Sequence, residues 1–161
     1  MQGNGSATNP WKTIGYGISR MVGGDTLIVK KGLYSGRANF IAGMPSGSPS
    51  QYTTIMAEAP MEVRIQNSSS ETLGYQENML AIKGAEGGVG VNINYVKVDG
   101  FIFDQVNSLY PPHNGSIGGN FNKLTRSIFR RAGIQDNWGG LLNVGGSNNL
   151  IEDVAGVGAC R

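Results

Sequence analysis

Apolar side chains in this chain recur at intervals of 26 or 27 residues, and this repeat constrains the fold more than any other feature of the sequence. Two columns of positions follow this repeat. In the first, Ile28, Ile55 and Ile82 are 27 residues apart, and so are Ile117 and Val144. In the second, a spacing of 26 residues separates Val98, Leu124 and Leu150, and likewise Ile102, Ile128 and Val154. A period between about 20 and 50 residues is typical of solenoids, in which one coil cannot bury its own apolar side chains. We therefore expect stacked coils whose strands pair in parallel, each inward side chain lying on its counterpart.

A helix is predicted ahead of the first strand. The segment before Gly23 has one apolar helical face, made by Trp11, Ile14, Ile18, Met21 and Val22. Thr8 or Asn9 can cap this helix, and Pro10 suits its first turn. Gly23 and Gly24 end it, and the β-branched run that follows predicts a strand bounded by Gly32.

The first third of the chain contains Asn9-Pro10-Trp11-Lys12-Thr13-Ile14, followed by Gly24-Asp25-Thr26-Leu27-Ile28-Val29 and then Gly32 and Tyr34. This order resembles the start of right-handed parallel β-helix proteins of the pectate lyase-like superfamily. The resemblance implies an all-β fold, a single-stranded right-handed parallel β-helix of about five coils whose N-terminal helix caps the open end. Residues 1–161 then form one domain, with the cap helix region at 1–23 and the coils at 24–161. No segment after Gly156 is suited to cover the last coil, so we expect the domain to continue beyond residue 161 or to self-associate through that coil.

Composition agrees with short strands and tight turns, and it limits the function classes. The 161 residues include 26 glycines and only 15% charged residues. A net charge of +2 is too mild to indicate nucleic-acid binding. Cys160 is the only cysteine, which excludes an internal disulfide, and no run of about eighteen apolar residues predicts a membrane span. The residues before Pro10 do not read as a signal peptide, although the expected location is extracellular or the cell surface.

The 26-residue offset brings charged side chains of successive coils together. Three pairs are expected: Arg126 over Glu152, Asp104 under Arg130, and Asp153 beside Ser127. With Asp99 and Arg131 they make one charged side of the solenoid. One interpretation is a set of cross-coil ion pairs on a solvated face, each worth less than about 1 kcal/mol.

The other interpretation is a polysaccharide site. In lyases that resemble this fold, carboxylates hold Ca²⁺ against a uronate, and a Lys or Arg abstracts its C5 proton. The resemblance implies Asp99 and Asp153 as candidate calcium ligands. The candidate catalytic residues are Arg126, Arg130 and Lys123, the last with a pKa lowered by Arg130 and Arg131. Candidate substrate-binding residues are Asp104, Arg131, Glu152, Trp138 and Tyr110, the two aromatic rings stacking on sugars.

Several other positions have structural interpretations. Asn122 and Asn148 are expected to form an amide ladder at a turn. Phe101, Phe103 and Phe129 are expected to point outward in part, if Val98, Gly100 and Ile102 point inward. His113 is the only histidine in the chain, and no complete signature of a lyase or of a two-aspartate glycosidase of this fold is matched.

Two functions from different classes remain open. The first is a carbohydrate-active protein or fragment that binds or cleaves an acidic polysaccharide, as a lyase or glycoside hydrolase. The second is a non-catalytic structural or adhesive extracellular module that stacks end to end into an assembly. The resemblance favours the first, and the uncovered last coil favours the second.

Overall fold

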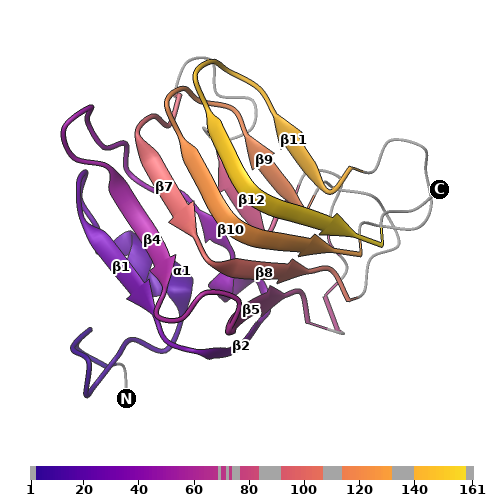
Figure 1. Cartoon of the computed structure of the whole chain (residues 1–161). Coiled ribbons are helices and arrows are strands. Elements are labelled where there is room, and N and C mark those ends of the chain that lie inside the picture. The colour runs from indigo at the N-terminus through magenta and orange to yellow at the C-terminus, as the bar shows by residue number, and fades with distance from the viewer. Residues whose placement is uncertain are drawn as a thin grey trace.

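The computed structural model describes residues 3–68, 70–71, 73, 77–83, 92–106, 114–131 and 140–158. These residues form a mostly β fold with parallel sheets, one short α-helix and one short 3-10 helix (Figure 1). The α-helix α1 spans Ile14–Ser19, and the 3-10 helix η1 spans Arg37–Asn39. Neither is long and apolar enough to cross a membrane. The prediction is confirmed at the level of an all-β fold with parallel strand pairing.

Two parallel sheets run through the part of the chain that the structure describes. The large sheet has the order β1-β4-β7-β10-β8-β5-β2, with β12 also paired to β10. Its strands are β1 (Thr26–Val29), β2 (Gly32–Ser35), β4 (Thr53–Ala57), β5 (Val63–Gln66), β7 (Val96–Asp99), β8 (Phe101–Asp104), β10 (Lys123–Arg130) and β12 (Leu150–Val157). The small sheet contains β3 (Ile41–Ala42), β6 (Leu80–Ile82), β9 (Gly115–Ile117) and β11 (Leu142–Val144).

The large sheet has two arms because β10 pairs with β7 through its first half and with β8 through its second half. We call β1, β4 and β7 the first arm and β2, β5 and β8 the second arm. Strands β10 and β12 run through both (Figure 1). In Figure 1 the strands of each arm follow one another in chain order, from indigo β1 and β2 to yellow β12.

The arms meet at a bend that one left-handed residue makes on each of the later coils. Gly100, Arg126 and Asp153 occupy this position with φ values of 90°, 46° and 53°. A Cβ atom on Gly100 would lie 3.1 Å from the Cα atom of Pro60, so the bend leaves little room there. The extra residue also reverses the alternation of the strands, because inward side chains fall on Val98 before the bend and on Phe101 after it.

This reversal explains why the expectation of outward phenylalanines was wrong. Phe101, Phe103 and Phe129 are all buried, and the Phe103 and Phe129 rings stack with centroids 4.9 Å apart. The outward positions of the second arm are instead taken by half-buried Ile102 and Ile128. The aromatic side chains therefore belong to the core and do not line a surface groove.

The register confirms part of the predicted repeat and corrects the rest. Val98 pairs with Leu124, Ile102 with Ile128, and Ile117 with Val144, as expected. The last coil is one residue longer than the coil before it. Leu124 therefore pairs with Ile151 and not with Leu150, and Ile128 pairs with Ala155 and not with Val154.

The column of Ile28, Ile55 and Ile82 was wrong. Ile28 pairs with Met56, and Ile82 lies in the small sheet, where it pairs with Ile117. The offset between paired strands changes from coil to coil along the first arm, and it is largest between β4 and β7, because the connections differ in length. A nearly fixed period therefore holds only for the later coils.

Asparagines bond to backbone groups at the turn that precedes the first arm. The Oδ1 atom of buried Asn122 accepts a hydrogen bond from the backbone N–H of Val96, and its Nδ2 donates to the carbonyl of Ile93. The backbone N–H of Asn122 donates to Oδ1 of Asn149. The predicted amide ladder of Asn122 and Asn148 was wrong, because each of these bonds joins a side chain to a backbone group and the asparagine next to Asn122 is Asn149.

The helix at the N-terminal end is shorter than predicted. It begins after Thr13, whose hydroxyl accepts a hydrogen bond from the backbone N–H of Tyr16, so Thr8 and Asn9 do not cap it. It ends at Arg20, before Met21 and Val22. The helix α1 packs against β1 and β3, and Figure 1 shows it at the opposite end of the large sheet from β12.

Candidate anion-binding site

The second arm presents polar side chains on its outward face, where β5, β8 and β10 end. Parallel pairing places Gln66 beside Asp104 and Asp104 beside Arg130. Side chains alternate along a strand, so the inward Phe103 sends its neighbour Asp104 to the outer face. The predicted contact between Asp104 and Arg130 is therefore confirmed by the register.

Asp104 is the fully buried centre of three arginines, and we call this group the Asp104 cluster. Its Oδ1 atom accepts a hydrogen bond from Nε of Arg131 at 2.7 Å, and Nη2 of Arg131 lies 2.7 Å from the same oxygen. The Oδ2 atom lies 3.8 Å from Nε of Arg64 and 3.9 Å from Nη1 of Arg130. These distances are too long for hydrogen bonds, and Oδ2 is buried without a hydrogen-bond partner among the described residues.

The Asp104 cluster has more positive charge than its centre can neutralise. Three guanidinium groups face one carboxylate, which leaves a formal charge of +2. The side chains of Arg64, Arg130 and Arg131 are 41%, 40% and 51% exposed, whereas Asp104 is 0% exposed. The cluster therefore offers charged N–H donors to solvent above a buried anchor, as an anion site requires.

Asp99 is the centre of a second group on the first arm, which we call the Asp99 cluster. Nε and Nη2 of Arg126 donate to Oδ1 and Oδ2 of Asp99 at 2.7 and 2.6 Å, and Nζ of Lys97 lies 3.1 Å from Oδ2. The hydrogen bonds from Arg126 lower the pKa of Asp99 to about 2, although burial opposes this shift. Both carboxylate oxygens are occupied, so this cluster is closed.

The two clusters share one construction. Arg126 and Arg131 both have left-handed backbones, with φ values of 46° and 55°, and each lies 27 residues after the aspartate that it holds. Arg126 lies at the bend within β10 and Arg131 directly follows β10, and each reaches back to an aspartate of the preceding coil. The sequence analysis named both arginines and both aspartates but did not pair them in this way.

Arg126 and Asp153 were placed incorrectly by one residue. Thr125 pairs with Glu152, and Arg126 is level with Asp153, because the last coil is one residue longer than expected. Ser127 pairs with Val154 and not with Asp153. The exposed Glu152 therefore lies beside Thr125, and the charge of Asp153 helps to raise the pKa of Arg126, after the larger effect of Asp99. Arg126 is consequently held as a cation, which does not suit a proton-abstracting base.

Lys123 does not lie beside Arg130 and Arg131 as predicted. It begins β10, whereas Arg130 ends the same strand, so the two lie roughly 20 Å apart along the chain. The Nζ atom of Lys123 lies 4.4 Å from the centre of the Tyr52 ring, in a cation–π contact. The two arginines are therefore not neighbours of Lys123.

The candidate calcium ligands are not brought together with other carboxylates. Both oxygens of Asp99 bond to Arg126, and Asp153 lies at the bend on the last described coil. Among the described residues no three His, Cys, Asp or Glu side chains form a group that could hold a metal ion. The carboxylates of both clusters bind arginines instead.

Some predicted residues cannot be placed, and others were missed. Trp138, Tyr110 and His113 lie outside the described residues. The sequence analysis missed Arg64, although its place between Val63 and Ile65 indicates an outward side chain on a strand.

A surface aromatic stack was missed as well. The Tyr95 and Phe121 rings stack at 5.1 Å, and Tyr52 meets Tyr95 edge to face at 5.8 Å. Tyr95 and Phe121 are 26 residues apart, which is the signal that could have found them. Both have left-handed backbones at the turn that carries Asn122, so the stack lies at that turn.

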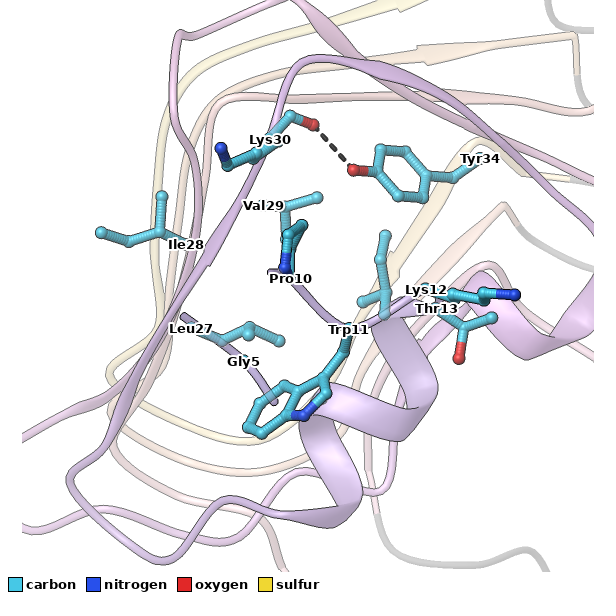
Figure 2. Close-up of a pocket in the computed structure, with 12 residues that line it drawn as sticks. Gly5, Pro10, Trp11, Lys12, Thr13, Leu27, Ile28, Val29, Lys30 and Tyr34 are labelled. Atoms are coloured by element: carbon cyan, nitrogen blue, oxygen red, sulfur yellow. Dashed lines mark hydrogen bonds between the residues drawn. The ribbon is translucent and has the colours of Figure 1, made fainter. Parts of the chain in front are cut away.

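A small hollow lies between the N-terminal segment and β1. Figure 2 shows the Trp11 ring, Leu27 and Val29 around it, while the Lys12 and Lys30 amines point away. The hydroxyl of Tyr34 donates to the carbonyl of Lys30 and closes one side. Its lining contains no carboxylate, histidine or cysteine among the described residues, so we do not consider this hollow a candidate catalytic site.

Comparisons with known proteins give no relative from which a site could be transferred. No protein-family model matches the chain, and neither a curated protein nor a solved structure matches it.

Proposed function

We propose that this chain is a right-handed parallel β-helix of the pectate lyase-like type that binds acidic polysaccharide on the outward face of its large sheet. The fold part of the proposal is supported by parallel pairing of each coil with the next in both sheets. It is also supported by the helix α1 beside the first coil. An extracellular or cell-surface location belongs to the same proposal, because acidic polysaccharides occur there.

The Asp104 cluster is the observation that carries the function. A fully buried carboxylate holds one arginine tightly and leaves two others near it without a hydrogen bond. Burying a charge costs free energy, so an anchor of this kind is useful where the exposed guanidinium groups have to be held in place. Carboxylate and sulfate groups of a polysaccharide are natural acceptors for such donors.

Further cations extend the face towards a polymer rather than a single small anion. Lys97 and Lys123 are paired in register near the beginning of the first arm, and Arg126 lies at the bend. The path from Lys123 to Arg130 along β10 is roughly 20 Å, which is the length of several sugar rings. The face therefore suits an extended polyanion.

Binding, and not cleavage, is the activity that the geometry supports best. Arg126 is paired with Asp99 and its pKa is raised by that hydrogen bond, so it does not have the properties of a lyase base. Cleavage is tested directly by incubating the protein with polygalacturonate, with and without Ca²⁺. A lyase would release unsaturated uronates, which absorb ultraviolet light.

The binding proposal is tested by replacing Arg64 and Arg130 together with alanine and measuring affinity for acidic polysaccharides by calorimetry. Neither arginine hydrogen-bonds to Asp104, so the fold should persist while affinity falls at least about 10-fold. The matched control is Arg20→Ala, which removes an exposed charge beyond helix α1. Equal affinity of all three proteins, or no binding by the unchanged chain, would overturn the proposal.

A second candidate function, an end-to-end structural module, is favoured by the apolar surface of the last described coil. Val144, Leu150, Ile151 and Val157 are exposed there, and β12 pairs with β10 alone among the described strands. Such a surface and such a strand edge favour a covering layer. Light scattering over a concentration series tests this, because Val157→Lys should abolish association if that coil is the contact.

A further inference from the structure

We propose that the Asp104 cluster selects sulfate esters over carboxylates, so that the polysaccharide it binds is a sulfated one. This inference rests on the proposed function, and it names the anionic group that the arginines recognise. It starts from the difference between the donors that Asp104 uses and the donors that remain.

Each guanidinium group carries five N–H donors. Among the three arginines, Asp104 takes hydrogen bonds from Arg131 alone and leaves the donors of Arg64 and Arg130 beyond hydrogen-bond reach of its oxygens. A planar carboxylate matches the fork of one arginine, as Asp99 does with Arg126. A sulfate ester, like a phosphate ester, presents three acceptor oxygens and can take donors from several arginines at once.

The three arginines approach from different parts of the fold. Arg64 comes from the middle of β5, Arg130 from the end of β10, and Arg131 from the left-handed turn that follows. All three come within 4 Å of one carboxylate, so their groups meet above a single point. A tetrahedral oxyanion suits donors that arrive from three directions better than a planar one does.

The net charge of the Asp104 cluster also favours a sulfate ester over a carboxylate. The formal charge of +2 remains after the aspartate at its centre is counted, and a sulfate ester keeps its negative charge at both pH 7 and pH 4. A uronate carboxylate loses its charge near its ordinary pKa of about 4. Binding of the preferred ligand should therefore persist at mildly acid pH.

The experiment compares dextran sulfate with carboxymethyl dextran of the same length and degree of substitution, and neutral dextran as the blank. We expect at least about 10-fold tighter binding of dextran sulfate by calorimetry at pH 7, and a larger ratio at pH 4. Arg64→Lys with Arg130→Lys keeps the charge but removes the guanidinium groups, so it should reduce the ratio to below about 3-fold. Arg20→Lys is the control and should leave the ratio unchanged.

The outcomes separate this inference from the proposed function. Equal binding of both charged polymers, weakened by Arg64→Ala with Arg130→Ala, would overturn sulfate selectivity and leave the polysaccharide proposal standing. No binding of either polymer would overturn both. Inorganic phosphate and a single-stranded oligodeoxynucleotide are added as competitors. If inorganic phosphate displaces dextran sulfate more strongly than inorganic sulfate does, or if the oligodeoxynucleotide binds more tightly than dextran sulfate of equal charge, the site recognises phosphate and the inference is wrong.

Discussion

The Asp99 and Asp104 clusters both pair an aspartate with an arginine 27 residues later, but they differ in how many carboxylate oxygens accept hydrogen bonds. Both have a buried aspartate at the end of a strand and an arginine 27 residues later with a left-handed backbone. In the Asp99 cluster the arginine spans both oxygens and a lysine adds a third contact. In the Asp104 cluster the arginine uses one oxygen, and two further arginines stand near the other.

Under the proposed function, one motif serves stability at Asp99 and recognition at Asp104. An aspartate with both oxygens bound leaves little for a ligand to gain, so the Asp99 cluster fixes the bend between the two arms. An aspartate surrounded by three arginines leaves exposed N–H donors that a second anion can accept in place of water. The charge balance, rather than the presence of arginine, therefore distinguishes the closed Asp99 cluster from the proposed binding site.

The largest expected effect comes from removing the arginine that hydrogen-bonds to Asp104. Arg131→Ala leaves a buried carboxylate without that hydrogen bond, which should lower the free energy of unfolding by roughly 2 to 4 kcal/mol. Urea denaturation monitored by circular dichroism measures this change. A loss below about 1 kcal/mol would mean that Arg64 or Arg130 can replace Arg131 as the hydrogen-bond donor to Asp104. Arg131 would then not differ from the other two arginines in its structural role.

Arg126 tests whether the bend or the ion pair matters more in the Asp99 cluster. Arg126→Ala should lower the free energy of unfolding, because Asp99 keeps only Lys97 as a charged partner among the described residues. Arg126→Gly should cost about 1 kcal/mol less, since glycine accepts the left-handed backbone that Gly100 has on the preceding coil. Thermal and urea denaturation of both variants give the comparison. A glycine variant no more stable than the alanine variant would show that the bend stores no strain.

Asp99 also makes stability depend on pH. Its pKa is lowered to about 2 in the folded chain, against about 4 when unfolded, so its stabilisation is fully present above pH 4 and is lost as pH falls towards 2. Because Arg126 is about half exposed, we expect the loss to be only about 1 kcal/mol. Unfolding free energies at pH 5, 4, 3 and 2 for the unchanged chain and Asp99→Asn measure it. Parallel curves for the two proteins would contradict the assignment.

The sequence predicted the later coils better than the earlier ones, and the reason is physical. The offset between β7 and β10 is nearly equal to the offset between β10 and β12, so pairs such as Val98 with Leu124 could be found. The offset between β4 and β7 is much larger, because a long connection is inserted. Burial stacks one strand on another but does not fix the length of the loop between them.

The charged residues were predictable as a group, but their contacts were not. Asp99, Asp104, Arg126 and Arg131 were all expected on one side of the chain. Their pairing depends on two left-handed arginines, Arg126 at the bend within β10 and Arg131 directly after β10, whose side chains reach the preceding coil. Arginine rarely takes that conformation, so no local pattern announced it. The left-handed backbone of Gly100 likewise explains why the inward orientation of Phe101 was not predicted.

The smallest effect is the one that most sharply separates the two clusters. Arg64→Ala should change the free energy of unfolding by less than about 0.5 kcal/mol, because its Nε lies 3.8 Å from Asp104 and the side chain is 41% exposed. Lys97→Ala, its counterpart at 3.1 Å from Asp99, should cost closer to about 1 kcal/mol. Paired urea denaturation curves resolve this difference. If Arg64→Ala costs as much as Arg131→Ala, Arg64 is a second structural partner of Asp104, and its guanidinium group is not available to a ligand.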